Sequence, residues 1–487
     1  MPLKPKTISN RARWVLAAAA CLLLGLGAGI WLGSRGMSWE TGPEARAARK
    51  FQEFLGIVAD EYVHPVAVDS LVEVTFNDVL GRLDPHSVYL PQSDALRLEE
   101  ELAGAYDGIG MEYRWIRDTV AVVSVRGPAR KKGLKPGDRL IAVDGVPVVG
   151  WSSDSLVGVL KGPAGSSVQV SVWSPRAKTV REVTVQRASI AVPSVRAARL
   201  DSGRVGYLRI ERFGEHTPEE VRSFLRQAKR ERLSGVVVDL RGNGGGFLAS
   251  GVAAADEFLS AGKTVVWTVG RSGPPERTVA TAGGSFEKGA VVVLVDGETA
   301  SAAEIFAAAL QDHRRALLVG KNTFGKGLVQ DERVLRDGSR LRLTTAVYLT
   351  PKKKNIQRLG KGAAGEGKGG LRPNVELSSD TLYGPHWLGS IRQLEVFDRL
   401  TFSWAEQDRG RTQEVWVTDE RLWEFLAEAG LEEAVASMTE QDVEWIRFAL
   451  TLEQIRFQRG AQASLELQLT RDYAVDAALA LLKRTRP

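Results

Sequence analysis

The sequence predicts a multidomain α+β protein with a single N-terminal transmembrane helix, a helical region, a β-rich domain, an α/β core and a helical C-terminal region. Three observations support this fold class. A chain of 487 residues is too long to fold around one hydrophobic core. An uncharged run near its start is long enough to cross a bilayer. After that run, hydrophobic periodicity changes from helical to alternating and later returns to helical.

The uncharged run of residues 14–34 is expected to be a membrane anchor. Its apolar part is about 20 residues long, which is the length that a membrane-spanning helix needs. Basic residues precede the run, and a basic flank stays in the cytoplasm. We therefore expect residues 1–13 to be cytoplasmic and the rest of the chain to be periplasmic or otherwise extracytoplasmic. The alternative is a cleaved signal peptide, but the run is long for one and has no clear Ala-x-Ala site.

The composition excludes nucleic acid as an expected partner. The chain has 65 basic and 59 acidic residues, a net charge of +6, and this balance is too even for a nucleic-acid surface. Cys21 is the one cysteine, so an intrachain disulfide is excluded.

Four regions follow the apolar run, and each is assigned by its periodicity and its glycine content. They are a helical region at 44–100, a β-rich domain at 104–188, an α/β core at 189–378 and a helical region at 379–487. Within the first region, residues 83–89 contain Asp-Pro and Ser, which predicts a turn followed by an extended piece. The Lys/Gly-rich segment 352–372 is expected to be a mobile loop.

Ser301 and Lys326 form the candidate catalytic pair. Ser301 opens a predicted helix, and Lys326 stands between two glycines after a predicted strand. An uncharged lysine can serve as the base for a serine nucleophile, so such a site needs no histidine, metal or other cofactor. Its pKa must then fall from about 10.4 to about 7–8, a cost of roughly 4 kcal/mol that desolvation beside Phe324 supplies. Gln330 can hold the amine without adding charge.

Other interpretations of these residues stay open. Ser301 with Glu304 is also a capping box, which taken alone is the better explanation of that serine. The residues from Gly320 onward match a phosphate-binding loop until Gly327 stands where Ser or Thr belongs. A Ser/His/Asp site is weak, because His313 is expected at the far end of the helix that Ser301 begins.

The glycines after the predicted strand 235–240 are candidates for an oxyanion hole. Gly244, Gly245 or Gly246 can turn a backbone N–H inward, and the N–H of Ala302 at the helix start can provide a second donor. The alternative is a tight strand-to-helix turn with no catalytic part.

A second glycine loop predicts peptide binding. Gly108, Ile109, Gly110 and Met111 precede a predicted strand, and such a loop can present N–H groups to the terminal carboxylate of a peptide while the strand edge pairs with it. The alternative is a small β-rich spacer.

The motifs together resemble the carboxyl-terminal processing (tail-specific) proteases over roughly residues 45–375. The resemblance rests on five segments: Leu83-Asp-Pro-His-Ser-x-Tyr89, Gly133-Leu-Lys-Pro-Gly-Asp138 with Val143-Asp-Gly145, Asp239-Leu-Arg-x-Asn-x-Gly-Gly246, Thr299-Ala-Ser-Ala-Ala-Glu304 and Thr323-Phe-Gly-Lys-Gly-x-Val-Gln330. It implies that residues 104–188 are a PDZ domain and that residues 189–378 are a serine protease core.

The same resemblance implies roles and partners. Ser301 would be the nucleophile, Lys326 the general base and Gln330 its orienting partner. The protein would be a serine endopeptidase that cleaves proteins at or near exposed, apolar C-terminal tails outside the cytoplasm. The alternative is a non-catalytic PDZ-type peptide-binding scaffold with a degenerate protease core.

The chain departs from the family pattern near the end of the core. A basic, glycine-rich insertion separates Ile356 from Gly370, and Asn374 replaces the acid of the usual Gly-Ile-x-Pro-Asp. The resemblance also suggests that the helical tail serves self-association, so a homo-oligomer is expected.

Overall fold

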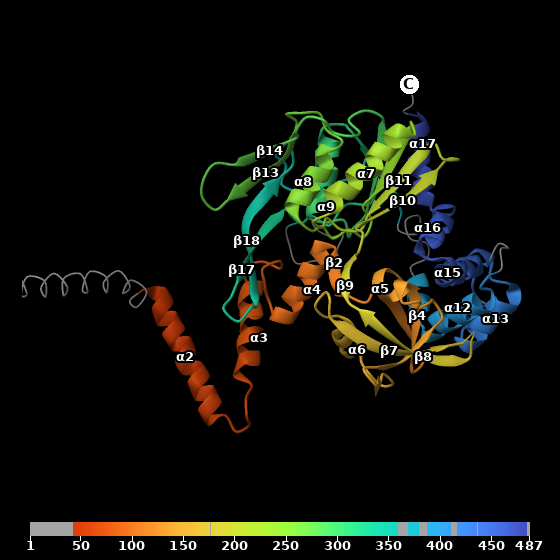
Figure 1. The fold of residues 1–487 in the computed structure, drawn as a ribbon. Helices are drawn as coiled ribbons and strands as arrows, with labels where there is room; N and C mark the ends of the chain where they lie inside the picture. Colours follow the sequence, from red (N-terminus) through yellow and green to blue (C-terminus); the bar gives the residue numbers. More distant parts are fainter. Residues whose placement is uncertain are drawn as a thin grey trace, which may run out of the picture. The chain divides into compact units, whose positions relative to one another are not determined.

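The computed structural model describes residues 42–175, 177–358, 369–378, 387–410, 416–435 and 437–484. They form two compact units, one up to Tyr89 and one from Leu90 onward (Figure 1).

The first unit is helical. It contains α2 (Pro43–Glu61) and α3 (Val68–Gly81), and β1 (Val88–Leu90) lies at its end. The predicted turn is confirmed: the carboxylate of Asp84 accepts hydrogen bonds from the N–H groups of His86 (2.7 Å) and Ser87 (2.8 Å). This Asx-type turn redirects the chain from α3 into the extended β1.

The predicted transmembrane helix is corrected. No helix in the part of the chain that the structure describes is both long and apolar enough to cross a membrane. The two longest described helices, α2 and α15 (Glu440–Arg459), carry acidic and basic residues along their length, and charged side chains are costly inside a bilayer. Residues 14–34 themselves lie outside the described residues. The prediction of a membrane anchor by an N-terminal helix is therefore wrong by this finding.

The second unit begins with α4 (Gln92–Ala103) and continues into a β-rich part. A six-stranded sheet has the order β3-β4-β5-β7-β8, with β6 paired to β5, and β2 pairs separately with β9. The elements of this part are β2 (Ala105–Gly108), β3 (Met111–Ile116), β4 (Thr119–Val125), α5 (Gly127–Lys131), β5 (Arg139–Val143), β6 (Val146–Pro147), α6 (Ser153–Leu160), β7 (Ser167–Ser174), β8 (Thr179–Gln186) and β9 (Ala188–Ala191). They enclose a core of their own that includes Val120, Leu140, Leu156 and Val170.

A largely parallel sheet forms the α/β core, in the order β10-β11-β12-β15-β16-β19. Only β10 runs antiparallel to its neighbour within this sheet. Its strands are β10 (Val195–Leu200), β11 (Val205–Ile210), β12 (Gly235–Asp239), β15 (Ala290–Val295), β16 (Leu317–Gly320) and β19 (Val375–Glu376). The central strands are runs of valine because helices cover both faces of the sheet.

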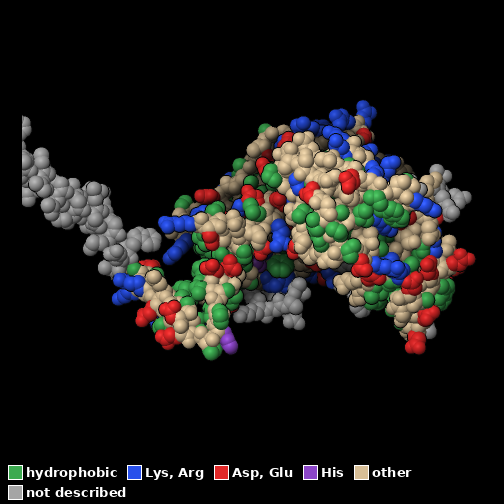
Figure 2. All heavy atoms as spheres, turned by 60° about the horizontal axis from the view of Figure 1, so that its bottom comes forward, with side chains coloured by type: hydrophobic (Ala, Val, Ile, Leu, Met, Phe, Trp, Pro, Cys, Tyr) green, Lys and Arg blue, Asp and Glu red, His purple; other side chains and the backbone are tan. Residues whose placement is uncertain are grey.

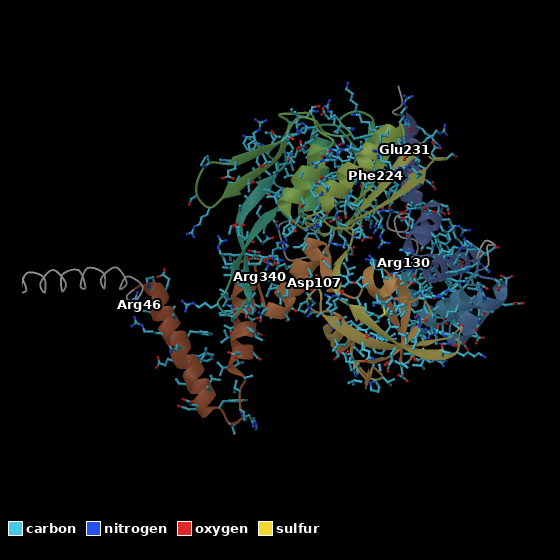
Figure 3. All side chains as sticks on the ribbon, in the orientation of Figure 1. Arg46, Asp107, Arg130, Phe224, Glu231 and Arg340 are labelled. Atoms are coloured by element: carbon cyan, nitrogen blue, oxygen red, sulfur yellow. The ribbon has the colours of Figure 1, made fainter. Side chains whose placement is uncertain are left out.

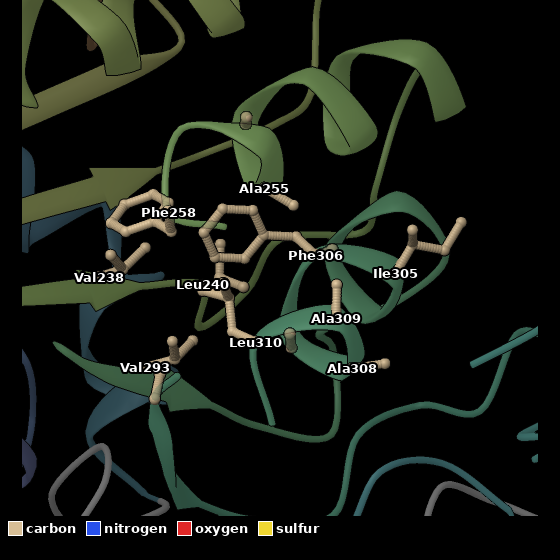
Figure 4. Packing of buried hydrophobic residues seen from close by; sticks show 14 of the residues in the cluster. Val238, Leu240, Ala255, Phe258, Val293, Ile305, Phe306, Ala308, Ala309 and Leu310 are labelled. Atoms are coloured by element: carbon tan, nitrogen blue, oxygen red, sulfur yellow. The ribbon is translucent and has the colours of Figure 1, made fainter. Parts of the chain in front are cut away.

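One face of this sheet packs against three helices: α7 (Thr217–Arg230), α8 (Leu248–Asp256) and α9 (Ala302–Asp312). Figure 4 shows Phe306 of α9 lying between α8 and the sheet, close to Phe258 and Leu240. Phe258 and Phe306 meet edge to face with centroids 5.6 Å apart. Fully burying such a side chain stabilises the fold by about 1.5–3 kcal/mol. This packing fixes the position of α9, and Ser301 directly precedes the first residue of that helix.

A second, antiparallel sheet contains β13 (Thr264–Gly270), β14 (Glu276–Val279), β17 (Leu328–Val334) and β18 (Arg340–Leu349). Figure 3 labels Arg340 at the start of β18, where it forms an ion pair with Glu99 of α4. This sheet therefore holds α4 beside the core.

The expected C-terminal helices are present in the described residues. They are α11 (Leu388–Arg392), α12 (Glu395–Gln407), α13 (Asp419–Glu428), α14 (Glu432–Val435), α15, α16 (Ala461–Leu469) and α17 (Tyr473–Arg484). Helices α11 to α15 share a core of their own.

Helix α17 covers the second face of the parallel sheet. Val475 and Leu482 lie in one buried cluster with Tyr207, Val237 and Leu294 of the strands. The last helix of the described chain thus completes the α/β sandwich.

A buried ion-pair network attaches α17 to the core. Arg241, which follows β12, pairs with Asp239 at 2.6 Å and with Asp472 at 2.7 Å. Asp472 in turn accepts the N–H groups of Ala474 and Val475 at the start of α17. The neighbouring guanidinium groups hold the pKa of Asp239 below its ordinary value in spite of its burial.

Replacing Asp472 with Asn is expected to lower the free energy of unfolding by about 3 kcal/mol, because Arg241 loses a charged partner inside the protein. Urea denaturation at neutral pH measures the loss. Asp419→Asn is the comparison: it removes an ion pair with Arg447 whose carboxylate is 82% exposed, so its expected effect is within about 1 kcal/mol. Equal losses in the two variants would contradict the assigned importance of the buried pair.

Candidate active site

Three loops meet at one edge of the parallel sheet. A glycine loop follows β12, a serine loop follows β15 and a lysine loop follows β16. Because β15 lies between β12 and β16 and all three are parallel, the three loops leave the same edge and lie side by side. The carboxyl edge of such a sheet is the usual place for a binding site.

Ser301 is held in a strained conformation at the start of α9. Its φ of +56° and ψ of −120° lie outside the regions that a residue with a side chain prefers, at a cost of about 1–3 kcal/mol. The glycine loop packs tightly against it: a Cβ atom on Gly245 would lie 2.8 Å from the Cβ of Ser301 and 2.8 Å from the carbonyl oxygen of Ala300. Glycine at position 245 is therefore required for the two loops to approach.

The buried carboxylate of Asp296 joins the glycine loop to the serine loop. One of its oxygens accepts the N–H of Gly242 at 2.8 Å. The other accepts the N–H groups of Glu298 (2.9 Å) and Thr299 (2.8 Å). The hydroxyl of Thr299 also donates to the carbonyl oxygen of Leu240 at 2.9 Å. These bonds set the position of the glycine loop relative to Ser301.

The buried carboxylate of Glu304 joins the serine loop to the lysine loop. It accepts the N–H groups of Ser301 (3.0 Å), Gly325 (2.8 Å) and Lys326 (2.8 Å), and the hydroxyl of Thr323. Burial raises the pKa of Glu304 above its ordinary value, and the four hydrogen bonds limit that rise because they favour the charged form. A single side chain thus fixes the backbone of both candidate catalytic residues.

The glycines on either side of Lys326 are explained by close packing. A Cβ atom on Gly325, whose φ is +87°, would lie 2.7 Å from the backbone nitrogen of Gly370. One on Gly327 would lie 2.8 Å from the backbone nitrogen of Gln357. The described ends of the basic insertion therefore support the lysine loop. Residues 359–368 of the segment expected to be mobile lie outside the described residues.

A cleft of about 620 Å³ brings most of the candidate residues together. Its lining includes Ser301, Lys326, Gln330, Gly244, Gly245 and Gly246. The amide of Gln330 donates to the hydroxyl of Thr344 at 3.2 Å, across the β17–β18 pair. Gln330 thus shares the cleft with Lys326, while its side-chain amide donates to Thr344.

The candidate oxyanion donors differ in their hydrogen bonding. The N–H of Gly245 donates to the side-chain oxygen of Asn243 at 2.8 Å. Among the described residues, no acceptor is found for the N–H of Gly244 or of Ala302. A Cβ on Gly244 would meet nothing within 4 Å, so this residue faces open space.

His313 lies away from Ser301, as the sequence predicts. It ends α9, and its Nε2 lies 2.7 Å from the carbonyl oxygen of Thr264. A helix of this length separates its two ends by about 16 Å. His313 therefore cannot reach the serine hydroxyl.

The predicted peptide-binding loop lies between β2 and β3 and does not line the cleft. Gly110 has a φ of +79°, and a Cβ there would lie 2.6 Å from the carbonyl oxygen of Arg126. Ile109 is buried in the core of this part and its carbonyl oxygen accepts the N–H of Ala129. Met111 begins β3, which stands at an end of its sheet in the described topology. An end strand presents unpaired backbone groups to a partner.

Sequence reasoning missed several residues that shape the site. Glu304 was expected only as part of a capping box, and Asp296 was not singled out. Asp296 ends a buried valine run as Asp239 does. Tyr348 is buried, and its hydroxyl donates to the carbonyl oxygen of Ser301 at 3.3 Å. Burial raises the pKa of Tyr348 well above its ordinary value, so the hydroxyl remains a donor.

Comparison with known proteins supports a single assignment. Residues 204–376 match Peptidase family S41, and residues 119–174 match a PDZ domain. The chain is 30% identical over 370 residues to carboxy-terminal processing protease CtpB of Bacillus subtilis, covering 72% of this chain and 76% of that protein. It is 33% identical over 317 residues to a carboxy-terminal-processing protease of Bartonella bacilliformis, covering 64% and 73%. A solved structure of a photosystem II D1 C-terminal processing protease is 28% identical, covering 69% of this chain and 88% of that one, with a TM-score of 0.38.

The matches extend over both the β-rich part and the α/β core, including the loops that carry Ser301 and Lys326. The chain belongs to the carboxy-terminal processing proteases of peptidase family S41.

Proposed function

We propose that this protein is a serine endopeptidase in which Ser301 is the nucleophile and Lys326 the general base. The observation that carries the proposal is their shared cleft, in which Glu304 fixes the backbone of both residues. Lys326 must be uncharged to act as a base, and the apolar side chains of Ile305 and Leu328 line the same cleft.

In the proposed reaction, the amine of Lys326 takes the proton of the Ser301 hydroxyl as its oxygen attacks the scissile carbonyl carbon. The resulting ammonium gives that proton to the leaving amine, and an acyl-enzyme remains on Ser301. Water then attacks the ester, Lys326 takes a proton from it, and Ser301 is regenerated when the proton returns to its oxygen.

We assign the oxyanion hole to the N–H groups of Ala302 and Gly244. Two arguments support this choice over Gly245. The N–H of Gly245 already donates to Asn243, and both proposed donors lack an acceptor among the described residues. Preorganised donors of this kind stabilise the developing negative charge without reorganisation.

We assign substrate capture to the PDZ domain, with boundaries proposed at 104–188. The loop Gly108–Met111 would hold the terminal carboxylate of a protein tail, and the edge of β3 would pair with the tail backbone. An apolar tail fits the apolar residues Met111 and Tyr113 that pack beside the domain core. A non-catalytic scaffold is not favoured, since Ser301, Lys326 and Gln330 all line one cleft.

Ser301→Ala and Lys326→Ala are each expected to abolish cleavage of an unfolded reporter protein with an apolar C-terminus. General-base loss typically lowers a rate by about 100- to 10,000-fold, and loss of the nucleophile by more. The measurement is kcat with the purified chain in the presence of a chelator. Lys354→Ala, at an exposed lysine in the same region, should retain wild-type kcat. If either active-site variant cleaves as fast as wild type, the assignment of that residue is wrong.

Amidation of the reporter's C-terminus is expected to raise KM by about tenfold with little change in kcat, because the loop Gly108–Met111 would lose a charge-assisted hydrogen bond worth roughly 1.5–3 kcal/mol. Steady-state kinetics on the free and amidated reporters measure this. The same KM for both reporters would show that the tail carboxylate is not recognised.

Glu304→Gln is expected to lower the free energy of unfolding by about 2–4 kcal/mol, because an amide group cannot accept hydrogen bonds from all four donors. It should also lower kcat, since Ser301 and Lys326 lose their common support. Urea denaturation and kinetics at one pH measure both effects. Glu298→Gln is the matched control on the same loop, at an exposed side chain. Indistinguishable behaviour of the two variants would refute the connecting role of Glu304.

A further inference from the structure

A second cavity lies beside the catalytic cleft. Its volume is about 510 Å³, and its walls come from β3 of the PDZ domain, from β10 and β11 of the core, and from four C-terminal helices, α11, α12, α15 and α16. Glu211 lines both this cavity and the catalytic cleft, so the two hollows are neighbours. The proposed catalytic mechanism uses none of its lining residues.

Basic side chains dominate the wall of this cavity. Its charged lining consists of Arg114, Arg196, Arg209, Arg392 and Arg456 against Glu211, Asp398 and Glu453. Four of these arginines have carboxylate partners: Arg196 with Glu211 at 2.7 Å, Arg114 with Asp398 at 3.5 Å, Arg209 with Asp239 at 3.7 Å and Arg456 with Glu112 at 2.8 Å. Burial raises the pKa of Asp398 and of Glu453 above their ordinary values.

Two donors in the wall have capacity for a ligand. Within the described part of the chain, no hydrogen bond or ion pair is found for the guanidinium of Arg392 or for the side-chain amide of Gln468. Burial lowers the pKa of Arg392, and the attraction of Glu453 opposes this effect. A guanidinium group presents paired N–H donors that match the two oxygens of a carboxylate.

We propose that this cavity is an exosite for an acidic segment of the polypeptide substrate. This inference rests on the proposed endopeptidase function and adds a substrate class to it. The cavity has the size of a site for an organic ligand, within the usual range of about 300–1,000 Å³, and is far larger than an inorganic anion needs. A chain that leaves the catalytic cleft past Glu211 enters it directly.

One arginine of this cavity also contacts the residues that precede the glycine loop. Arg209 lies 3.7 Å from Asp239, and its guanidinium donates to the carbonyl oxygen of Arg241 at 3.4 Å. Arg241 directly precedes the glycine loop that contains Gly244. An acidic segment bound to Arg209 is therefore linked through this guanidinium to the base of the proposed oxyanion loop.

The test compares reporters that differ only in a short segment of Asp and Glu, placed on either side of the scissile bond, with a Ser/Gly segment as the neutral reference. At low ionic strength, the acidic segment on one side should lower KM by about threefold or more, and added salt should remove this difference. Gln468→Glu places a negative charge in the cavity at an exposed position and should abolish the preference without changing kcat or KM on the neutral reporter.

Gln441→Glu is the matched control, because it makes the same substitution at an exposed residue of α15 that does not line the cavity. It should keep the wild-type preference. Equal KM values for acidic and neutral reporters in wild type, or a preference that survives in Gln468→Glu, would overturn the exosite. Loss of cleavage of the neutral reporter in Ser301→Ala tests the proposed function separately. Competition by inorganic phosphate without any preference for acidic reporters would show a small-anion site and would also overturn the proposal.

Discussion

The site depends on one carboxylate that accepts four hydrogen bonds. Glu304 receives backbone N–H groups from the serine loop and from the lysine loop, together with the hydroxyl of Thr323. These loops follow different strands and have no covalent reason to keep a fixed separation. Leaving such a carboxylate without partners inside a protein would be very costly, so the donors and the acceptor constrain one another. The strained Ser301 and the closely packed Gly245 are acceptable because this network holds them.

The architecture was largely predictable, because its signals are local. Valine runs of the length of strands, glycine loops after them and helical periodicity can be read from a few adjacent residues. The grouping of Ser301, Lys326 and Gln330 in one cleft also follows, since parallel strands carry their loops to the same edge. What could not be predicted is non-local. Nothing near Glu304 in the sequence shows that its carboxylate reaches Gly325, and nothing near Arg241 indicates Asp472 as its partner.

The C-terminal region shows the limit of arguing from periodicity. Amphipathic helices were expected there, and helices are found, but the apolar face of α17 packs on the parallel sheet of its own chain, beside Tyr207 and Val237. Periodicity reveals that a helix has an apolar side and leaves open what covers that side. Figure 2 shows acidic and basic side chains interspersed over one face of the molecule, in keeping with the even charge balance. The local concentration of arginine around the second cavity arises only when distant segments fold together.

The position of α17 has a consequence for how the protein matures. Synthesis proceeds from the N-terminus, so the strands β11, β12 and β15 and the loops that carry Ser301 and Lys326 leave the ribosome well before residues 473–484 do. Until then, Tyr207, Val237 and Leu294 have no helix over them and Arg241 lacks one of its two acidic partners. The nascent chain therefore carries all its candidate catalytic side chains on an unfinished sheet. The sheet that positions the candidate site is therefore complete only after the last described helix has been made.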